Sequence, residues 1–373
     1  MLPVKSSFFP DADRPQFVID IFLPEGSPLH RTNDVAKQVE QVVRRLSATT
    51  FDADELISIT GKKGAPAPRL DNMAVYVGAG GARFYTGLDP KSDASNYAII
   101  WINTTDATQN SQYIADIRRA IWEGVGQPGD KDYIPPIAGA RIIPKSLVMG
   151  TPVPSPIEYR ILGPRLANEK VLRRYSEQLE NAMRSSGMAW DIHDSWGELG
   201  DQLDVNIRST AANMAGVTNA TVAQTLNAYY TGHYLTTYRE GDHQVPIKLR
   251  LPPEQRRTLD SLRNAYVEGY SGKVPLEAVA DLEMKRRPAK ITRFQRERMM
   301  AVLARPESGI LAREVLETLK PQVDEIAAQL PPGYRIEDGG IEEEAARGER
   351  QNSASLGIGV AMILLCLIIQ YNS

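Results

Sequence analysis

Apolar residues in the first part of the chain switch between strand and helix spacing in a regular order. Residues 16–23 (QFVIDIFL) alternate enough to predict a strand, and Pro24 and Gly26 end it. Apolar side chains three and four positions apart predict a helix through residues 35–46. Further strands are predicted at 56–60, 97–103 and 139–144, and a second helix at 113–122. The order β-α-β-β-α-β is the split βαβ pattern of a ferredoxin-like sandwich.

The same order begins again near residue 156 and is then interrupted. It starts with a strand at 156–162, a helix at 168–184 and a short strand at 189–193. It resumes with a strand at 298–303, a long helix at 310–330 and a closing strand at 333–337. The sequence therefore predicts an α+β protein with two copies of one supersecondary unit, the second of which carries an insertion.

The insertion has its own pattern of short elements. A strand, a helical turn and a helix are predicted at 204–207, 210–214 and 221–229. Two strands at 234–239 and 244–251 follow and face each other across a glycine turn. The tip of this predicted β-hairpin consists of Arg239, Glu240, Gly241 and Asp242. A projecting hairpin with a charged tip suggests contact with a partner, and the alternative is a plain surface hairpin.

The C-terminal residues are the most apolar part of the chain. No charged residue occurs between Gln351 and Ser373, and residues 356–369 form an almost unbroken apolar run. Because about 20 apolar residues span a bilayer, we predict a transmembrane helix at 353–371. The alternative is a buried helix that ends a soluble domain, but such a helix normally shows a polar face. Residues 1–13 do not read as a signal peptide, so the whole resembles a piece of a larger membrane protein.

Length, charge and cysteine content narrow the possible classes. The 373 residues suffice for two or three folded units at roughly 100 to 200 residues each. The net charge of 43 − 46 = −3 gives no general basic surface for phosphates, so we expect no binding to nucleic acid. A single cysteine excludes an internal disulfide framework and a cysteine-based zinc site.

Three patterns that often accompany catalysis do not predict an enzyme here. The glycines of residues 78–83 (GAGGAR) lead into extended chain, whereas a phosphate-binding loop needs them to open a helix. The four histidines lack zinc spacing. The carboxylates of residues 342–344 read as a hydrated helix start, where negative charge suits the dipole. We therefore expect no catalytic residue, no metal site and no cofactor.

Four short segments, spread over nearly the whole chain, carry a family resemblance. Residues 8–26 contain FFPDADRP and LPEG, and residues 213–226 read NMAGVTNATVAQTL. Residues 272–276 read GKVPL, and residues 339–342 (GGIE) precede the uncharged helix that ends in QYNS. In this order they resemble the second large periplasmic loop of resistance nodulation division (RND) efflux permeases of the acriflavine-resistance type.

The resemblance implies a map of subdomains. Residues 1–147 correspond to the first porter subdomain of the second half of such a pump, and residues 148–193 with 285–352 to the next one. Residues 194–284 correspond to an inserted docking subdomain. The family's proton-relay carboxylates belong to membrane helices outside this chain. The resemblance thus implies a porter and docking fragment of a proton-driven multidrug or solute efflux permease, with no transport activity alone.

The same resemblance implies a location and a set of partners. Residues 1–352 are expected in the periplasm, beside a bacterial inner (plasma) membrane whose lipid bilayer the chain contacts. Permeases of this family assemble as homotrimers, and their small-molecule substrates enter clefts between porter subdomains. The docking subdomain meets a periplasmic adaptor protein and an outer-membrane channel.

Two sites follow from the resemblance. The first is a flexible loop on the substrate path, here Gly61, Lys62, Lys63, Gly64 and Arg69, in which the glycines permit changes of shape. Drug pumps of the family often place aromatic residues in this loop, so the two lysines disfavour a hydrophobic cationic drug as the substrate. The alternative is that the loop is a solvated basic turn. The second site is the docking hairpin with its tip at residues 239–242.

A different class of function also fits the duplicated pattern. A membrane-anchored periplasmic binding or scaffold protein could use ferredoxin-like units for protein contacts. An upstream reading frame encoding apolar helices with an intramembrane aspartate would favour the pump fragment. A promoter and ribosome site at Met1 would favour the scaffold.

Overall fold

The described chain divides into two compact units. The computed structural model describes residues 10–47, 69–130, 133–150, 153, 155–252, 254, 259–270 and 272–371. One unit comprises residues 1–198 and 288–373, and the other comprises residues 199–287. The first unit holds two α/β sandwiches, each with its own hydrophobic clusters, and the second unit is the insertion. The predicted α+β class is confirmed.

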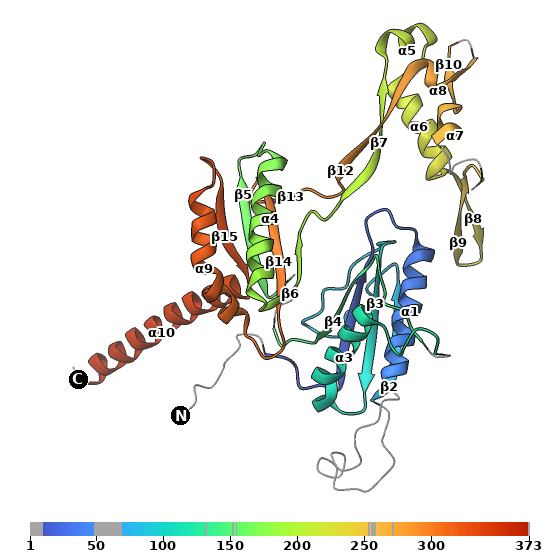
Figure 1. The fold of residues 1–373 in the computed structure, drawn as a ribbon. Helices are drawn as coiled ribbons and strands as arrows, with labels where there is room; N and C mark the ends of the chain where they lie inside the picture. Colours follow the sequence, from blue (N-terminus) through green and yellow to red (C-terminus); the bar gives the residue numbers. More distant parts are fainter. Residues whose placement is uncertain are drawn as a thin grey trace. The chain divides into compact units, whose positions relative to one another are not determined.

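The first sandwich is an antiparallel sheet of order β2-β3-β1-β4 with helices packed against one face (Figure 1). Its elements are β1 (Gln16–Phe22), α1 (Leu29–Ser47), β2 (Leu70–Val77), β3 (Tyr97–Thr104), η1 (Ala107–Gln109), α3 (Asn110–Glu123) and β4 (Arg141–Ser146). Alternate residues of β1, such as Phe17 and Ile19, lie in one cluster with Val39 of α1 and Ile117 of α3. Full burial of each such side chain contributes roughly 1.5–3 kcal/mol.

The second strand of this sheet, β2, lies later in the chain than predicted. The strand predicted at 56–60 falls outside the described residues, whereas residues 70–77 were not predicted as a strand. Met73 and Val75 pack toward the helices, and Tyr76 contacts Trp101 with ring centroids 4.5 Å apart. Because apolar side chains lie on both faces, the segment shows no clean alternation of polar and apolar residues.

The second sandwich has a sheet of order β13-β14-β5-β15, in which β14 also pairs with β6. Its elements are β5 (Ile157–Gly163), α4 (Glu169–Ser186), β6 (Ala189–Asp194), β13 (Thr292–Phe294), β14 (Glu297–Pro306), α9 (Ala312–Ala328) and β15 (Arg335–Gly340). The Asn168 side chain caps α4 by accepting a hydrogen bond from the Lys170 amide at 2.9 Å. Gly187 ends the same helix with a left-handed φ of 63°.

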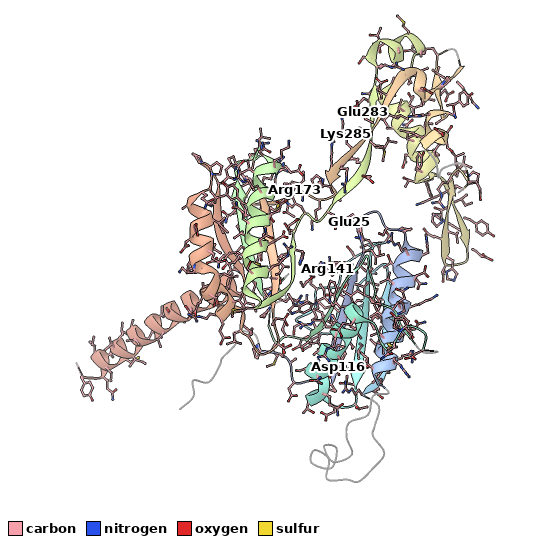
Figure 2. The ribbon with its side chains drawn as sticks, in the orientation of Figure 1. Glu25, Asp116, Arg141, Arg173, Glu283 and Lys285 are labelled. Carbon is pink, nitrogen blue, oxygen red and sulfur yellow. The ribbon has the colours of Figure 1, made fainter. Side chains whose placement is uncertain are left out.

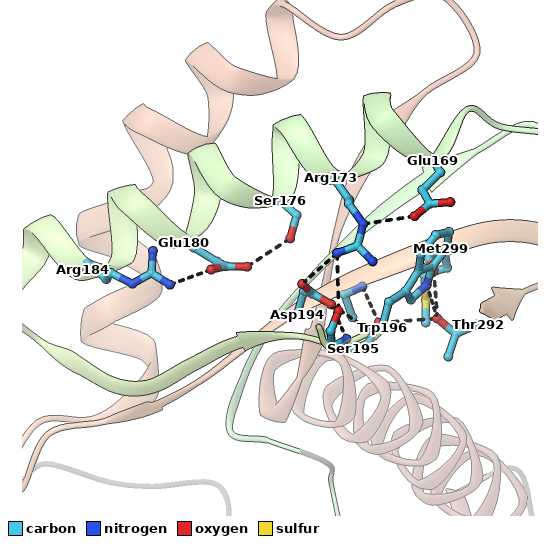
Figure 3. A network of polar contacts seen from close by, with 12 residues as sticks. Glu169, Arg173, Ser176, Glu180, Arg184, Asp194, Ser195, Trp196, Thr292 and Met299 are labelled. Carbon is cyan, nitrogen blue, oxygen red and sulfur yellow. Dashed lines mark hydrogen bonds and ion pairs between the residues drawn. The ribbon is translucent and has the colours of Figure 1, made fainter. Parts of the chain in front are cut away.

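A polar network holds the second sandwich together where the insertion leaves it (Figure 3). One carboxylate oxygen of Asp194, at the end of β6, accepts backbone hydrogen bonds from Trp196 at 2.7 Å and Gly197 at 2.6 Å. Arg173 of α4 lies 3.8 Å from the other oxygen. The buried Trp196 ring nitrogen donates to the Met299 carbonyl of β14 at 2.7 Å. These contacts tie the last residues before the insertion to the strand that follows it.

The insertion has a small core of its own. Its elements are β7 (Leu199–Ile207), α5 (Ser209–Ala215), α6 (Asn219–Tyr230), β8 (His233–Glu240), β9 (His243–Leu249), α7 (Leu259–Arg263), β10 (Tyr266–Gly269), β11 (Gly272–Pro275), α8 (Leu276–Val279) and β12 (Ala280–Pro288). Strands β7 and β12 pair at its base. Val267 and Leu276 are fully buried in its core. A capping box between Thr218 and Thr221 starts α6.

Helix α10 (Ile341–Tyr371) follows β15 directly. Gly340 makes the junction with a φ of 68°, and a Cβ there would lie 2.7 Å from the Pro156 carbonyl oxygen. Apolar side chains near the end of α10, such as Leu364 and Ile368, are exposed. Among the described residues, no helix reaches the length and apolar character needed to cross a membrane. The transmembrane helix predicted at 353–371 is therefore not confirmed.

Candidate functional site

Charged side chains of the two sandwiches meet where the edge strands β4 and β6 approach each other. Arg141 of β4, labelled in Figure 2, donates from Nη1 to both carboxylate oxygens of Asp191 at 3.2 and 3.3 Å. The same nitrogen donates to His193 Nε2 at 2.7 Å. We call this region the polar seam. It comprises Asp20, Lys91, Arg141 and Lys145 of the first sandwich, and Asp191, His193 and Arg305 of the second.

Asp191 occupies an unusual backbone conformation in the seam. Its φ is 52°, in the left-handed region that few residues other than glycine and asparagine or aspartate adopt. The pairing with β14 shifts at this point, because Leu303 pairs with His193 and Arg305 pairs with Trp190, so β6 itself carries one extra residue beside Asp191. Bulges redirect side chains, and here Arg305 Nε lies 3.8 Å from Asp191 Oδ2. The Asp191 carboxylate, only 6% exposed, thus has a guanidinium from each sandwich.

His193 is neutral in this arrangement. Its Nδ1 lies 2.7 Å from the backbone carbonyl oxygen of Asp191. A carbonyl oxygen can only accept a hydrogen bond, so Nδ1 must carry the proton. Its Nε2 accepts from Arg141, so the hydrogen-bond network assigns the proton to Nδ1. Burial lowers the pKa of His193, and the positive charge of Arg141 lowers it further.

Asp20 is the buried carboxylate on the first sandwich side of the seam. Lys145 Nζ lies 2.5 Å from one oxygen, and the Tyr97 hydroxyl donates to the other at 2.7 Å. Burial alone would raise the pKa of Asp20, but the charge and hydrogen bond of Lys145 and the hydrogen bond of Tyr97 outweigh it. The pKa of Asp20 therefore lies below its usual range, and the charge of Arg305 also contributes to this shift.

The glycine run at residues 78–83 shapes the loop that carries Lys91. Gly80 donates its amide to the Lys91 carbonyl at 2.8 Å, and a Cβ at Gly80 would lie 2.6 Å from the Lys91 nitrogen. Lys91 Nζ lies 4.2 Å from the centre of the Phe22 ring, and Arg141 lies 4.5 Å from the same ring. Burial lowers the pKa of Lys91, although the charge of Asp20 opposes this. The glycines thus allow a close chain approach that places a cation in the seam.

A second polar contact joins the two sandwiches beside the seam. Arg118 of α3 forms an ion pair with Glu307 at 2.6 Å. Its guanidinium also lies 4.8 Å from the centre of the Trp190 ring at the start of β6. The Trp190 ring nitrogen donates to the Pro306 carbonyl at 3.0 Å, which fixes the ring in place.

These contacts define what the seam can do chemically. It holds four cationic side chains and two carboxylates, so it has a formal excess of positive charge. The hydrophobic clusters of the two sandwiches are separate, so the contact between the sandwiches is polar. Polar interfaces between parts of one chain permit relative motion. The seam therefore has the chemistry to bind a negatively charged group. Its polar character also permits the two sandwiches to move apart.

Most of the predicted substrate-path loop cannot be placed. Gly61, Lys62, Lys63 and Gly64 lie outside the described residues. Arg69 is described and lies away from the seam. Its Nη1 forms an ion pair with Asp116 of α3 at 2.6 Å, and its guanidinium lies 5.6 Å from the Tyr113 ring centre.

The predicted hairpin is present as β8 and β9, in the insertion. Gly241 and Asp242 form its two-residue turn, and the Gly241 φ of 58° with glycine first fits a type II′ turn. Arg239, Glu240 and Asp242 are exposed. Both strands also expose large apolar side chains. These are Tyr234, Leu235, Tyr238, Val245, Ile247 and Leu249.

The polar seam was not predicted from the sequence. One signal was available, because Asp20 interrupts the otherwise apolar strand QFVIDIFL, and a buried carboxylate needs a charged or hydrogen-bonding partner. Its partners come from distant positions and could not be read from spacing. In the part of the chain that the structure describes, no group of three histidine, cysteine, aspartate or glutamate side chains is arranged to hold a metal ion.

Comparison with known proteins supplies the family. The sequence model of the AcrB/AcrD/AcrF family matches residues 1–373. The toluene efflux pump membrane transporter TtgB of Pseudomonas putida is 25% identical over 173 residues, 46% of this chain and 16% of that protein. The cobalt-zinc-cadmium resistance protein CzcA of Cupriavidus metallidurans is 22% identical over 360 residues, 94% of this chain and 32% of that protein.

A solved structure shares the fold. The crystal structure of a heavy metal efflux pump superposes with a TM-score of 0.67 and 15% sequence identity. The match covers 95% of this chain and 34% of the pump. The chain thus spans about a third or less of the length of these relatives.

Proposed function

Because the chain belongs to the AcrB/AcrD/AcrF family, we propose that it forms the periplasmic porter and docking portion of a proton-driven RND efflux permease of a bacterial inner membrane. The family match over residues 1–373 supports this role. So does the shared fold with a pump of which the chain covers about a third. The family consists of transporters, and the function is accordingly passage of a solute rather than catalysis.

We assign the parts of this portion as follows. Residues 1–147 form one ferredoxin-like porter subdomain, and residues 148–193 with 285–352 form the next. Residues 194–284 form the docking subdomain. The strand order β2-β3-β1-β4 of the first sandwich and the compact insertion at 199–287 support this assignment.

The polar seam is the part of the substrate path that this chain supplies. The observation that carries this proposal is Arg141, which is one-third exposed and binds Asp191 and His193 of the other sandwich. A solute that passes between porter subdomains must break or replace such contacts. The net positive charge of the seam favours a solute with an anionic group over a cationic drug.

The insertion serves assembly in this proposal. A homotrimer of complete permeases would place the β8–β9 hairpin against a periplasmic adaptor protein or an outer-membrane channel. Isolated two-stranded hairpins are marginally stable in water, and this one exposes aromatic and aliphatic side chains on both strands. A protein partner that covers them would stabilise the hairpin.

The experiment uses the complete permease that contains this chain. We expect Arg141→Gln to reduce efflux of its substrates while the protein accumulates normally, because the contacts across the seam are lost. Arg119→Gln is the matched control, since Arg119 is an exposed arginine on α3 with no role in the seam. Equal efflux by both variants would contradict the role of the seam. Absence of efflux by the unaltered complete permease would contradict the function itself.

A further inference from the structure

A shallow groove lies on the second sandwich between α9 and the edge strand β15. This is the edge of the sheet opposite to β6 and the polar seam. The groove encloses about 250 Å³. Its floor consists of Tyr159 from β5 with Leu316 and Val323 from α9. Asp324 of α9 and Asp338 of β15, both exposed, also line it.

The sheet register explains how Tyr159 and Asp338 come to share this groove. The two residues are direct partners in the antiparallel pairing of β5 and β15. Side chains directly opposite each other in a ladder point to the same face of the sheet. This face is the one that α9 covers, and Tyr159 lies in the cluster beneath the helix. The groove is therefore built by regular secondary structure.

The Tyr159 side chain is buried except where it lines the groove. It is 2% exposed, and its hydroxyl forms no hydrogen bond with any described residue. Burial raises the pKa of this hydroxyl, and the charges of Asp338 and Asp324 raise it further. Among the described residues, the buried polar atoms without a partner do not include this oxygen, so it meets the solvent of the groove. A ligand in the groove could therefore donate a hydrogen bond to it.

Carboxylates outnumber cations in the groove, which is lined by Glu317, Asp324, Asp338 and Glu342 and by Arg313 and Lys320. Among the described residues, no cation forms an ion pair with Asp338 or Asp324. Burial raises the pKa of Asp338, the charge of Lys320 opposes this, and the charge of Asp324 adds to it. Arg313, which also lines the groove, is engaged by Glu317 at 3.0 Å.

We propose that this groove binds a small organic cation, namely a primary amine with a short carbon chain. Its ammonium group would lie between the carboxylates of Asp338 and Asp324 and donate to the Tyr159 hydroxyl. Its carbon chain would rest on Leu316 and Val323. An amine fits better than a bare metal ion, because the floor is apolar and the described residues offer no three-ligand metal group. This site is separate from the seam and does not depend on the proposed transport function.

Calorimetry with the full chain and 1,4-diaminobutane at fixed ionic strength tests the proposal. We expect saturable binding of the diamine and none of 1,4-butanediol, which has the same length without charge. Asp338→Asn should weaken binding about tenfold, as expected for loss of a charge-assisted hydrogen bond. Tyr159→Phe, which keeps the ring, should weaken it roughly threefold through loss of one neutral acceptor.

Glu325→Gln is the matched control, because it removes one negative charge from α9 at an exposed position outside the groove. It should leave the affinity unchanged. Three outcomes would overturn the proposal: no saturable binding of the diamine, equal weakening by the control and Asp338→Asn, or full displacement of the diamine by equimolar Mg²⁺. If Asp338→Asn fails to fold, the affinity of Tyr159→Phe decides.

Discussion

The polar seam and the tip of the β8–β9 hairpin are both rich in charge, yet they differ in every physical respect. In the seam, Asp191 is 6% exposed and lies against Arg141 and Arg305, which come from different sandwiches. At the tip, Arg239 and Asp242 are exposed to water. The tip could be read from the sequence and the seam could not. Charge along the sequence therefore does not show which charged side chains are buried, because burial depends on partners from distant parts of the chain.

Asp191→Ala should give the largest difference between the two regions. The substitution leaves the guanidinium groups of Arg141 and Arg305 without their shared carboxylate. We expect the free energy of unfolding to fall by about 3 kcal/mol. This value is at the low end for buried ion pairs, because Arg141 is partly exposed. Chemical unfolding followed by tryptophan fluorescence measures this cost. Asp191→Asn controls for backbone strain, since asparagine also tolerates a positive φ. A loss below about 0.5 kcal/mol would remove the distinction between seam and surface.

A smaller effect should appear in the pH dependence of stability. Because the pKa of His193 is lowered in the folded state, the unfolded chain binds this proton more readily below about pH 6.5. The free energy of unfolding should therefore fall as the pH drops below that value. A second loss should follow below about pH 4, where the unfolded chain binds a proton at Asp20 and the folded protein, with its lowered pKa, does not.

His193→Gln isolates the first of these losses. The variant should flatten the stability curve above pH 5 and leave the loss near pH 4 in place. His243 at the hairpin is the comparison residue, because it is exposed, and His243→Gln should not alter the curve. If both variants give the same curve as the unaltered chain, His193 is not buried against Arg141 in solution.

The smallest effect is expected at the hairpin tip. Arg239→Glu combined with Asp242→Lys should change the unfolding free energy by less than about 0.5 kcal/mol, as is usual for surface positions. In the complete permease, however, the pair should weaken crosslinking to the adaptor protein. Unchanged crosslinking and unchanged efflux would make the tip an ordinary surface turn. A large loss of stability would instead show that the tip is buried.

The sequence predicted those elements whose periodicity is strong. The strand at 97–103 agrees closely with β3 because it is a short continuous apolar run, buried on both faces. The helix at 168–184 agrees closely with α4 because it presents one clear apolar face. Strand β2 was missed because its two faces are both partly covered. The hairpin was found because Gly241 marks its turn locally.

The seam illustrates the limit of such reasoning. Arg141 and Asp191 are 50 residues apart, and nothing in the spacing connects them. The groove at Tyr159 was missed for the same reason, since Asp324 and Asp338 reach it from a helix and a strand late in the chain. Local patterns reveal turns and faces, whereas sites made by several elements require the fold.

The division of the second sandwich also has a consequence for protein synthesis. Strand β14 lies between β5 and β6 in the sheet. In the sequence, about a hundred residues separate the end of β6 from the start of β14. At about 10 residues per second, the ribosome needs on the order of ten seconds to make the intervening insertion. During that time the edges of β5 and β6 that pair with β14 have no partner strand. The contiguous first sandwich meets no such delay, so the second sandwich should complete its sheet later than the first.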